Sequence, residues 1–240
     1  HRSGIRPDGA ELLPAAAALA DGAELVGVLT HAGDSYECKS TAEIEAAAEA
    51  ERAGIVLAAE RLRAAGHTVK IVSAGSTPTL MFAKDETGVT EMRAGVCALF
   101  DLFMSNVGAC TVEEIAGSVL ATVIGRQVDK RRVILDCGFL ALSRDRGTAR
   151  QAHDYGYGLV CGIDGKPLAD GTIVLTGTNQ EHGILTLPEN SPLTQEDFPI
   201  GRRLRILPNH ACPTAAPYAS LVLIENGRVA EVLDHVRGWD

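Results

Sequence analysis

The first 95 or so residues alternate between stretches with a helical hydrophobic pattern and short apolar runs. Asp8 is the expected N-cap of the first helical stretch, and Ser40 or Thr41 with Glu43 marks the start of the second. The apolar runs are rich in β-branched residues, as buried parallel strands are. The predicted helices are 8–20 and 41–65, with a short helix opening at Ser76-Thr77-Pro78, and the predicted strands are 24–30, 69–73 and 89–93.

From about residue 118 the pattern changes to short strands separated by Gly and Asp turns. The Asn226-Gly227 pair, between two alternating segments, predicts a β-hairpin. The predicted strands are 119–128, 132–136, 171–176, 183–186, 203–206, 219–225 and 228–236. Repeated βα units followed by such strands predict an α/β domain, 1–104, and an antiparallel β-domain, 105–240, with the boundary near 104–118.

Composition narrows the class of protein. The 240 residues suffice for one large domain or two modest ones, and 46% of them are hydrophobic. A net charge of −9 without a basic patch argues against a nucleic-acid partner. No apolar run reaches the roughly 18–20 residues of a membrane span. Six cysteines without a C-x-x-C pair fit free thiols in a reducing compartment, so we expect a cytoplasmic protein.

The triplet His210-Ala211-Cys212 is the strongest candidate for chemistry. It follows a predicted strand, and on an extended backbone the side chains of His210 and Cys212 would project from the same face. An imidazole and a thiolate suit Zn²⁺, and two protein ligands leave coordination positions open for a substrate. A packed cysteine beside a surface histidine is the alternative for this triplet taken alone.

Polar and small residues follow three of the predicted strands at the end where βα barrels place their active sites. His31 and Tyr36 follow the first strand, Ser76 and Thr77 follow the second, and Gly95-Val96 follows the third. Small residues ahead of a helix allow backbone N–H groups to approach an anion. We therefore expect these loops to form a cofactor site; for the Ser/Thr loop, an ordinary capped βα loop is the alternative.

Eight ordered motifs extend over the whole chain. They are Arg2-Ser3-Gly4, Thr30-His31-Ala32-Gly33 with Tyr36, Gly75-Ser76-Thr77-Pro78-Thr79, Glu91-Met92-Arg93-Ala94-Gly95 with Asp101, Asp136-Cys137-Gly138 with Ala141-Leu142-Ser143, Gln180-Glu181-His182-Gly183, Pro208 to Thr214, and Gly238-Trp239. In this order they resemble the D-serine dehydratase and D-threonine aldolase family of pyridoxal phosphate enzymes, a fold type III group related to alanine racemase. Three positions depart from the family pattern: Leu29, Ala94 and Cys97.

The resemblance implies part of a (β/α)8 barrel that binds pyridoxal 5′-phosphate, followed by a β-domain with a metal site. It implies that Tyr36 and Thr77 contact the cofactor and that Gly95 and Val96 offer backbone N–H groups to its phosphate. His31 and Ser76 are the further cofactor contacts that we expect. The metal ligands that the resemblance implies are His210 and Cys212.

The implied activity is that of a pyridoxal phosphate- and zinc-dependent lyase that eliminates water and ammonia from a D-3-hydroxy amino acid. Cys212 favours a dehydratase, because the aldolase branch typically has an aspartate there, which suits Mn²⁺ or Mg²⁺. We expect a homodimer, or an assembly with a separate N-terminal segment.

The family's Schiff-base lysine lies upstream of the first residue of this sequence, so the resemblance implies that the N-terminal part of the barrel is missing, cleaved or held as another chain. A truncated, non-catalytic member therefore stays as the alternative to the lyase. The lysines present, none of which matches the motif, are Lys39, Lys70, Lys84, Lys130 and Lys166.

Overall fold

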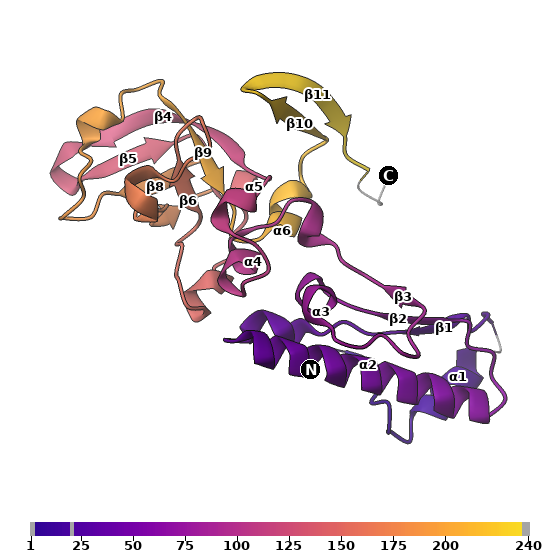
Figure 1. Cartoon of the computed structure of the whole chain (residues 1–240). Helices are drawn as coiled ribbons and strands as arrows, with labels where there is room; N and C mark the ends of the chain where they lie inside the picture. The colour runs from indigo at the N-terminus through magenta and orange to yellow at the C-terminus, as the bar shows by residue number, and fades with distance from the viewer. Residues whose placement is uncertain (1–2, 20–21, 237–240) are drawn as a thin grey trace. The chain divides into compact units, whose positions relative to one another are not determined.

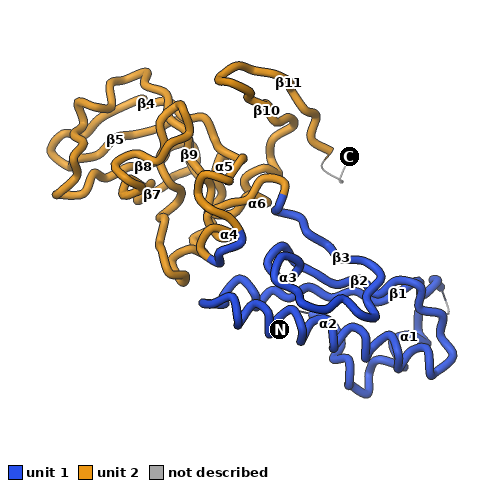
Figure 2. Tube along the Cα trace, in the orientation of Figure 1, with its two compact units in different colours: residues 1–97, 107–109 blue, residues 98–106, 110–240 orange. Residues whose placement is uncertain are grey.

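The computed structural model describes residues 3–19 and 22–236. The chain divides into two compact units (Figure 2), His1–Cys97 with Val107–Ala109, and Ala98–Asn106 with Cys110–Asp240. We call them the parallel unit and the antiparallel unit after their sheets. Among the described residues, no helix is both long and apolar enough to cross a membrane.

The parallel unit is a three-stranded sheet with helices packed against it (Figure 1). The strand order is β1-β2-β3 and both pairings are parallel. Apolar residues of the two longer helices and of β2 form its core. Its elements are α1 (Leu12–Leu19), β1 (Gly27–Leu29), the 3-10 helix η1 (Gly33–Glu37), α2 (Thr41–Ala64), β2 (Ile71–Ala74), α3 (Thr77–Phe82) and β3 (Glu91–Met92).

Both predicted helices are confirmed, and α2 starts where its capping residues predict. The Ser40 hydroxyl accepts a hydrogen bond from the Glu43 amide at 3.3 Å, and the Glu43 carboxylate accepts one from the Lys39 amide at 2.7 Å. The prediction that Asp8 caps α1 is wrong, since the helix begins at Leu12. Asp8 instead pairs with Arg6 at 2.9 Å, and this ion pair occupies the carboxylate outside the helix.

The three predicted parallel strands are present but shorter than the apolar runs. The run 24–30 contributes only Gly27–Leu29 to the ladder, and 89–93 contributes only Glu91–Met92. Part of the missing ladder is made by side chains: the Thr90 hydroxyl accepts a hydrogen bond from the Val72 amide at 2.8 Å. Neither run is fully buried: Leu25, Val28, Val89 and Met92 are partly buried against the core, whereas Leu29 is 74% exposed, so the apolar runs overestimate the length of the strands.

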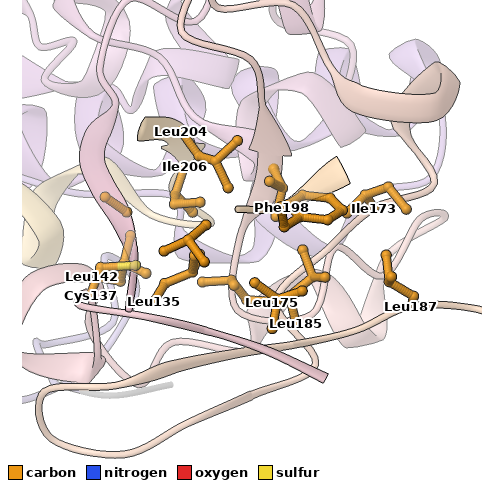
Figure 3. Packing of buried hydrophobic residues seen from close by; sticks show 14 residues of the cluster. Leu135, Cys137, Leu142, Ile173, Leu175, Leu185, Leu187, Phe198, Leu204 and Ile206 are labelled. Carbon is orange, nitrogen blue, oxygen red and sulfur yellow. The ribbon is translucent and has the colours of Figure 1, made fainter. Parts of the chain in front are cut away.

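The antiparallel unit is built on a six-stranded sheet of order β6-β9-β4-β5-β8-β7. Its central strand, β4, pairs with β5 on one side and β9 on the other. Fourteen buried residues form the core of this unit, including Leu135, Leu185 and Phe198 (Figure 3). The strands are β4 (Val119–Gln127), β5 (Arg132–Leu135), β6 (Leu159–Cys161), β7 (Gly177–Thr178), β8 (Gly183–Thr186) and β9 (Arg203–Leu207).

One predicted strand of this unit is wrong and two short strands were missed. Residues 171–176 form no ladder: a 3-10 helix, Leu168–Gly171, precedes an isolated bridge between Val174 and Leu159. Ile173 and Leu175 are nevertheless buried, so the alternation that predicted the strand records which side chains enter the core. The strands not predicted are β6 and β7, with three and two residues.

A hairpin of β10 (Ser220–Glu225) and β11 (Arg228–Asp234) follows, as the sequence predicts. Asn226 and Gly227 have φ of 51° and 74°, so both central residues of the turn adopt the left-handed conformation that an Asn-Gly pair tolerates. The predicted end of β11 is close to the observed one. Some positions named in the sequence analysis lie outside the described residues: Arg2 and Gly238-Trp239 of the motifs, and Ala20 at the predicted end of the first helix.

Candidate functional site

The His210-Cys212 pair lies in the antiparallel unit, directly after β9. His210 is the extended N-cap of the short helix α6 (Ala211–Ala215), and Cys212 lies in the first turn of that helix. The prediction that the pair sits on one extended strand is therefore wrong. Pro213 is tolerated in a first helical turn because amides there have no partner within the helix. The Cys212 side chain is nevertheless close enough to the His210 ring to raise its pKa, so the two groups lie near one another.

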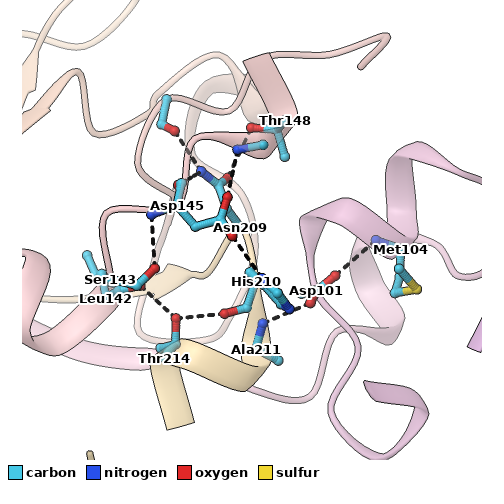
Figure 4. A network of polar contacts seen from close by, with 12 residues as sticks. Asp101, Met104, Leu142, Ser143, Asp145, Thr148, Asn209, His210, Ala211 and Thr214 are labelled. Carbon is cyan, nitrogen blue, oxygen red and sulfur yellow. Dashed lines mark hydrogen bonds and ion pairs between the residues drawn. The ribbon is translucent and has the colours of Figure 1, made fainter. Parts of the chain in front are cut away.

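Asp145 orients the His210 ring. The ring nitrogen Nδ1 lies 2.8 Å from Asp145 Oδ2, and the other carboxylate oxygen accepts a hydrogen bond from the Gly147 amide at 2.7 Å (Figure 4). The hydrogen bond from His210 lowers the pKa of Asp145, so the carboxylate is ionised. It therefore accepts a hydrogen bond from the N–H group at Nδ1 of the ring. When the ring is neutral, this hydrogen bond favours the tautomer with the proton on Nδ1 and the lone pair on Nε2.

Charge around His210 governs its protonation. Burial lowers the pKa of His210, but the hydrogen bonds to Asp145 and to the Cys212 side chain, with the charges of Cys212 and Asp101, raise it to about 10. A metal ion that binds this ring must therefore displace a proton. Phe103 packs edge-on against the ring, with 5.6 Å between centroids, and shields that side of it.

Asn209 fixes the segment that carries Asp145. Its side-chain amide donates to the carbonyl oxygens of Asp145 at 2.9 Å and Gly156 at 2.7 Å. Its side-chain oxygen accepts a hydrogen bond from the Thr148 hydroxyl at 3.2 Å. Because Asn209 is buried and adjacent to His210 in the chain, it sets the distance between the histidine and its carboxylate partner.

Asp101 anchors the start of α6 from another direction. Its carboxylate accepts hydrogen bonds from the amides of Ala211 and Met104, at 2.8 and 2.9 Å (Figure 4). Burial raises the pKa of Asp101, and these two amide hydrogen bonds offset part of that effect. Asp101 thereby holds the one residue that separates His210 from Cys212.

The donor set fits a metal ion that has few protein ligands. In the described part of the chain, no group of three or more His, Cys, Asp and Glu side chains could hold a metal ion. The pair offers an imidazole oriented by a carboxylate and a thiol on an exposed residue, Cys212. Imidazole and thiolate donors suit Zn²⁺, and the remaining positions would be open to water or substrate.

Two other thiols of the antiparallel unit are unsuited to such a role. Cys137 and Cys161 are buried, and burial raises the pKa of each to about 12. They are therefore neutral, unreactive thiols at physiological pH.

The second group of candidate residues lies in the parallel unit, in the loops after β1 and β2. Gly75 follows β2 with a φ of +117°, and a Cβ there would lie 2.6 Å from the carbonyl oxygen of Arg93. Only glycine fits this close approach to the segment after β3. His31 Nδ1 lies 3.4 Å from the Gly75 carbonyl oxygen, and the His31 and Tyr36 rings lie 5.9 Å apart.

Thr77 carries the clearest sign of an unfilled contact in this unit. Its side chain is buried, and its hydroxyl oxygen has no hydrogen-bond partner among the described residues. The neighbouring Ser76 hydroxyl, in contrast, is engaged with Ser35 and Thr79. At the end of β3, a Cβ at Gly95 would meet nothing within 4 Å, so the backbone there is open, whereas Val96 is buried.

Comparisons with known proteins agree with this arrangement. Residues 1–102 match the family model described as "Alanine racemase, N-terminal domain", and residues 116–224 match "Putative serine dehydratase domain". The chain is 50% identical over its whole length to D-threo-3-hydroxyaspartate dehydratase of Delftia sp., and a solved structure of that enzyme superposes with a TM-score of 0.90. The chain belongs to the D-serine dehydratase family.

A second dehydratase and a more distant solved structure extend the comparison. D-serine dehydratase of Dictyostelium discoideum is 30% identical over 83% of the chain. A D-threonine aldolase from Filomicrobium marinum, at 20% identity and a TM-score of 0.73, shares the fold. The chain spans 63% of the length of the Delftia relative and 51% of the Dictyostelium one.

Two solved variants of a D-threo-3-hydroxyaspartate dehydratase are relevant to the His210-Cys212 pair. In one a histidine is replaced by alanine, and in another, described as the metal-free form, a cysteine two positions further along is replaced. His210 and Cys212 of this member of the family have the same spacing. The sequence analysis found the pair but missed Asp145, which is 65 residues away and belongs to no local pattern.

Proposed function

We propose that the protein is a metal- and pyridoxal phosphate-dependent lyase that acts on a small D-3-hydroxy amino acid. It would remove water and then release ammonia, leaving a 2-oxo acid. The observation that carries the proposal is the His210-Cys212 pair, which has a carboxylate behind the histidine ring and few protein ligands. Family membership at 50% identity to a dehydratase supports the reaction class. We further propose a homodimer in the cytoplasm.

The metal ligands in this proposal are His210 Nε2 and Cys212 Sγ, with Zn²⁺ as the ion. When bound, Zn²⁺ would act as a Lewis acid that makes a coordinated hydroxyl a better leaving group. Asp145 accepts the hydrogen bond from Nδ1, so the proton that the metal displaces would be the one on Nε2, whose lone pair would then bind the ion. Asn209 and Asp101 limit the movement of the donors, because Asn209 donates to the carbonyl oxygen of Asp145 and Asp101 accepts from the amide of Ala211, which lies between His210 and Cys212.

The cofactor residues in this proposal lie in the parallel unit, which we take to be part of a (β/α)8 barrel, residues 1–104, ahead of the metal-binding domain 105–240. When bound, pyridoxal phosphate would acidify the Cα–H bond of the attached amino acid. The unpartnered Thr77 hydroxyl would donate to a cofactor oxygen, and the phosphate would lie against the open backbone at Gly95, with the N–H groups of Gly95 and Val96 as donors. Tyr36, His31 and Ser76 would line or support this site.

Substrate and product analysis tests the proposed reaction. The intact protein is incubated with D-threo-3-hydroxyaspartate, D-serine and D-threonine, with Zn²⁺ or after chelator treatment. We expect 2-oxo acid and ammonia from at least one of the first two, and loss of product after chelation. Aldehyde with glycine from D-threonine would point to a retro-aldol lyase instead. Absence of both products, without visible cofactor absorbance, would support the non-catalytic alternative.

Substitution of Cys212 by aspartate is expected to change the metal preference. A carboxylate is a harder donor than a thiolate, so Cys212→Asp should weaken Zn²⁺ binding by about tenfold or more and shift the preference toward Mn²⁺. Competition between the two ions, followed by metal analysis, measures this. Cys97→Asp, at another exposed cysteine, is the control. An unchanged preference in Cys212→Asp would contradict the assignment of this ligand.

The hydroxyl of Thr77 can be tested separately. Thr77→Val keeps the shape but removes a buried oxygen that has no partner within the described chain. We expect little loss of stability and about a tenfold loss of affinity for pyridoxal phosphate, since one hydrogen bond to a charged group is removed. Thermal unfolding and absorbance titration measure the two effects. Unchanged affinity would remove Thr77 from the site.

A further inference from the structure

The buried face of α2 contains one residue that its hydrophobic pattern does not explain. The positions follow helical spacing, yet among the buried residues of this fully described helix only Glu51 is charged. A buried carboxylate is costly unless hydrogen bonds compensate it. The other buried residues of the face are Ile44, Ala48, Ile55, Ala58, Ala59 and Leu62.

Both carboxylate oxygens of Glu51 are used, and each reaches a different loop. Oε1 accepts a hydrogen bond from the Ala32 amide at 2.9 Å, in the loop after β1. Oε2 accepts one from the Thr79 hydroxyl at 2.9 Å, in the segment after β2. One side chain therefore connects the two loops that carry His31 and Tyr36, and Ser76 and Thr77.

Further hydrogen bonds close these contacts into a ring. The oxygens of Thr79 and Ser76 lie 3.1 Å apart, and those of Ser76 and Ser35 lie 3.2 Å apart. The Ser35 hydroxyl donates to the Ala32 carbonyl at 2.7 Å, which returns to the residue that Glu51 holds. Ser35, Ser76 and Thr79 are all buried, so the ring is shielded from water.

The ring has one consistent proton arrangement at its two ends. A carboxylate only accepts, so the Thr79 hydroxyl must donate to Glu51, and its oxygen is then free to accept from the Ser76 amide at 2.9 Å. A carbonyl only accepts as well, so the Ser35 proton is committed to Ala32. The Ser76 proton remains within the ring, between Thr79 and Ser35. Glu51 and the Ala32 carbonyl thus fix the protons of Thr79 and Ser35, whereas the Thr77 hydroxyl takes no part in the ring.

We propose that Glu51 is a positioning residue that locks the loops after β1 and β2 to one another and so presents His31, Tyr36 and Thr77 as a single anion-binding site. The inference rests on the proposed function only for the ligand that the loops receive. The mutual fixing of the loops follows from the ring of hydrogen bonds itself.

Three variants test this role in the intact protein. Glu51→Ala removes both acceptors, whereas Glu51→Gln can still accept from the Ala32 amide and donate to the Thr79 oxygen. Ile55→Ala, one turn further along the same buried face, is the matched control, because it disturbs the core and its apolar side chain makes no hydrogen bond to either loop. Amide hydrogen exchange of residues 30–37 and 75–79, thermal unfolding, and titration with pyridoxal 5′-phosphate are the measurements.

In Glu51→Ala we expect at least about a tenfold faster exchange of the Ala32 amide and about a tenfold weaker affinity for pyridoxal phosphate, from the loss of hydrogen bonds to a charged group. Glu51→Gln should retain most of the protection of the Ala32 amide and most of the affinity for pyridoxal phosphate. Ile55→Ala should lower thermal stability without a selective loss of that protection or that affinity. Equal effects of Glu51→Ala and Ile55→Ala on the loops, or no recovery in Glu51→Gln, would overturn the proposal. If the wild-type protein binds no cofactor, the proposed function fails, and the exchange data alone decide whether Glu51 couples the loops.

Discussion

Replacing Asp145 with asparagine is expected to weaken metal binding by about 10- to 100-fold, the usual cost of losing the carboxylate behind a metal-binding histidine. An asparagine keeps the shape of Asp145 but removes the charge that holds the proton on His210 Nδ1. The ring can then rotate or adopt the other tautomer, and Nε2 is no longer presented reliably. Competition with a fluorescent zinc chelator measures the affinity directly.

The control for this prediction is a carboxylate nearby in the sequence. Asp154 pairs with Arg146 at 2.8 Å and makes no contact with His210, so Asp154→Asn should leave metal affinity within about twofold, since an exposed ion pair contributes little. If Asp145→Asn and Asp154→Asn lost metal affinity equally, the cause would be the loss of a negative charge from the protein and not the contact with His210. Unchanged affinity in Asp145→Asn would contradict the orienting role of Asp145.

Replacing Phe198 with alanine is expected to destabilise the antiparallel unit by about 3–5 kcal/mol. The Phe198 side chain is fully buried in the core of this unit (Figure 3), and the guanidinium of Arg202 lies 5.3 Å from its ring centroid. Truncation leaves a cavity that the surrounding strands cannot fill without moving. Urea unfolding monitored by circular dichroism measures the loss.

Val128→Ala serves as the comparison for Phe198→Ala. Val128 is 73% exposed, so removing its methyl groups should change the free energy of unfolding by less than about 0.5 kcal/mol. A Phe198→Ala protein as stable as Val128→Ala would show that the core packing described here is wrong.

The sequence predicted correctly the elements that depend on residues close together in the chain. The Ser40 cap, the hydrophobic spacing of α2 and the Asn226-Gly227 turn each act within a few residues, and the structure has all three. The strand predicted over 171–176 is wrong because alternation reports burial: a 3-10 helix occupies the start of the segment, and its later backbone hydrogen bonds, to 157–160 and to Ile184, form only an isolated bridge.

The candidate site shows the same division. The spacing of His210 and Cys212 pointed to a pair of metal donors, although the backbone that brings them together is a helix start. Asp145 and Glu51 could not be predicted from the sequence, because their importance depends on partners 65 and 28 residues away in the chain. A charged residue within the apolar face of α2 was the one available sign of Glu51.

The strand order of the antiparallel unit has a consequence for how this unit folds. β4 meets β5 after a short turn, but its other neighbour, β9, lies far along the chain, with Val119 paired to Ile206. Closing so long a loop is slow compared with forming the local strand pair. His210 and Cys212 follow β9 in the chain, so we expect these two residues, the proposed metal donors, to be among the last groups to be brought into place. Uptake of a metal ion would thus mark the completion of the sheet, and chains interrupted earlier in folding would stay metal-free.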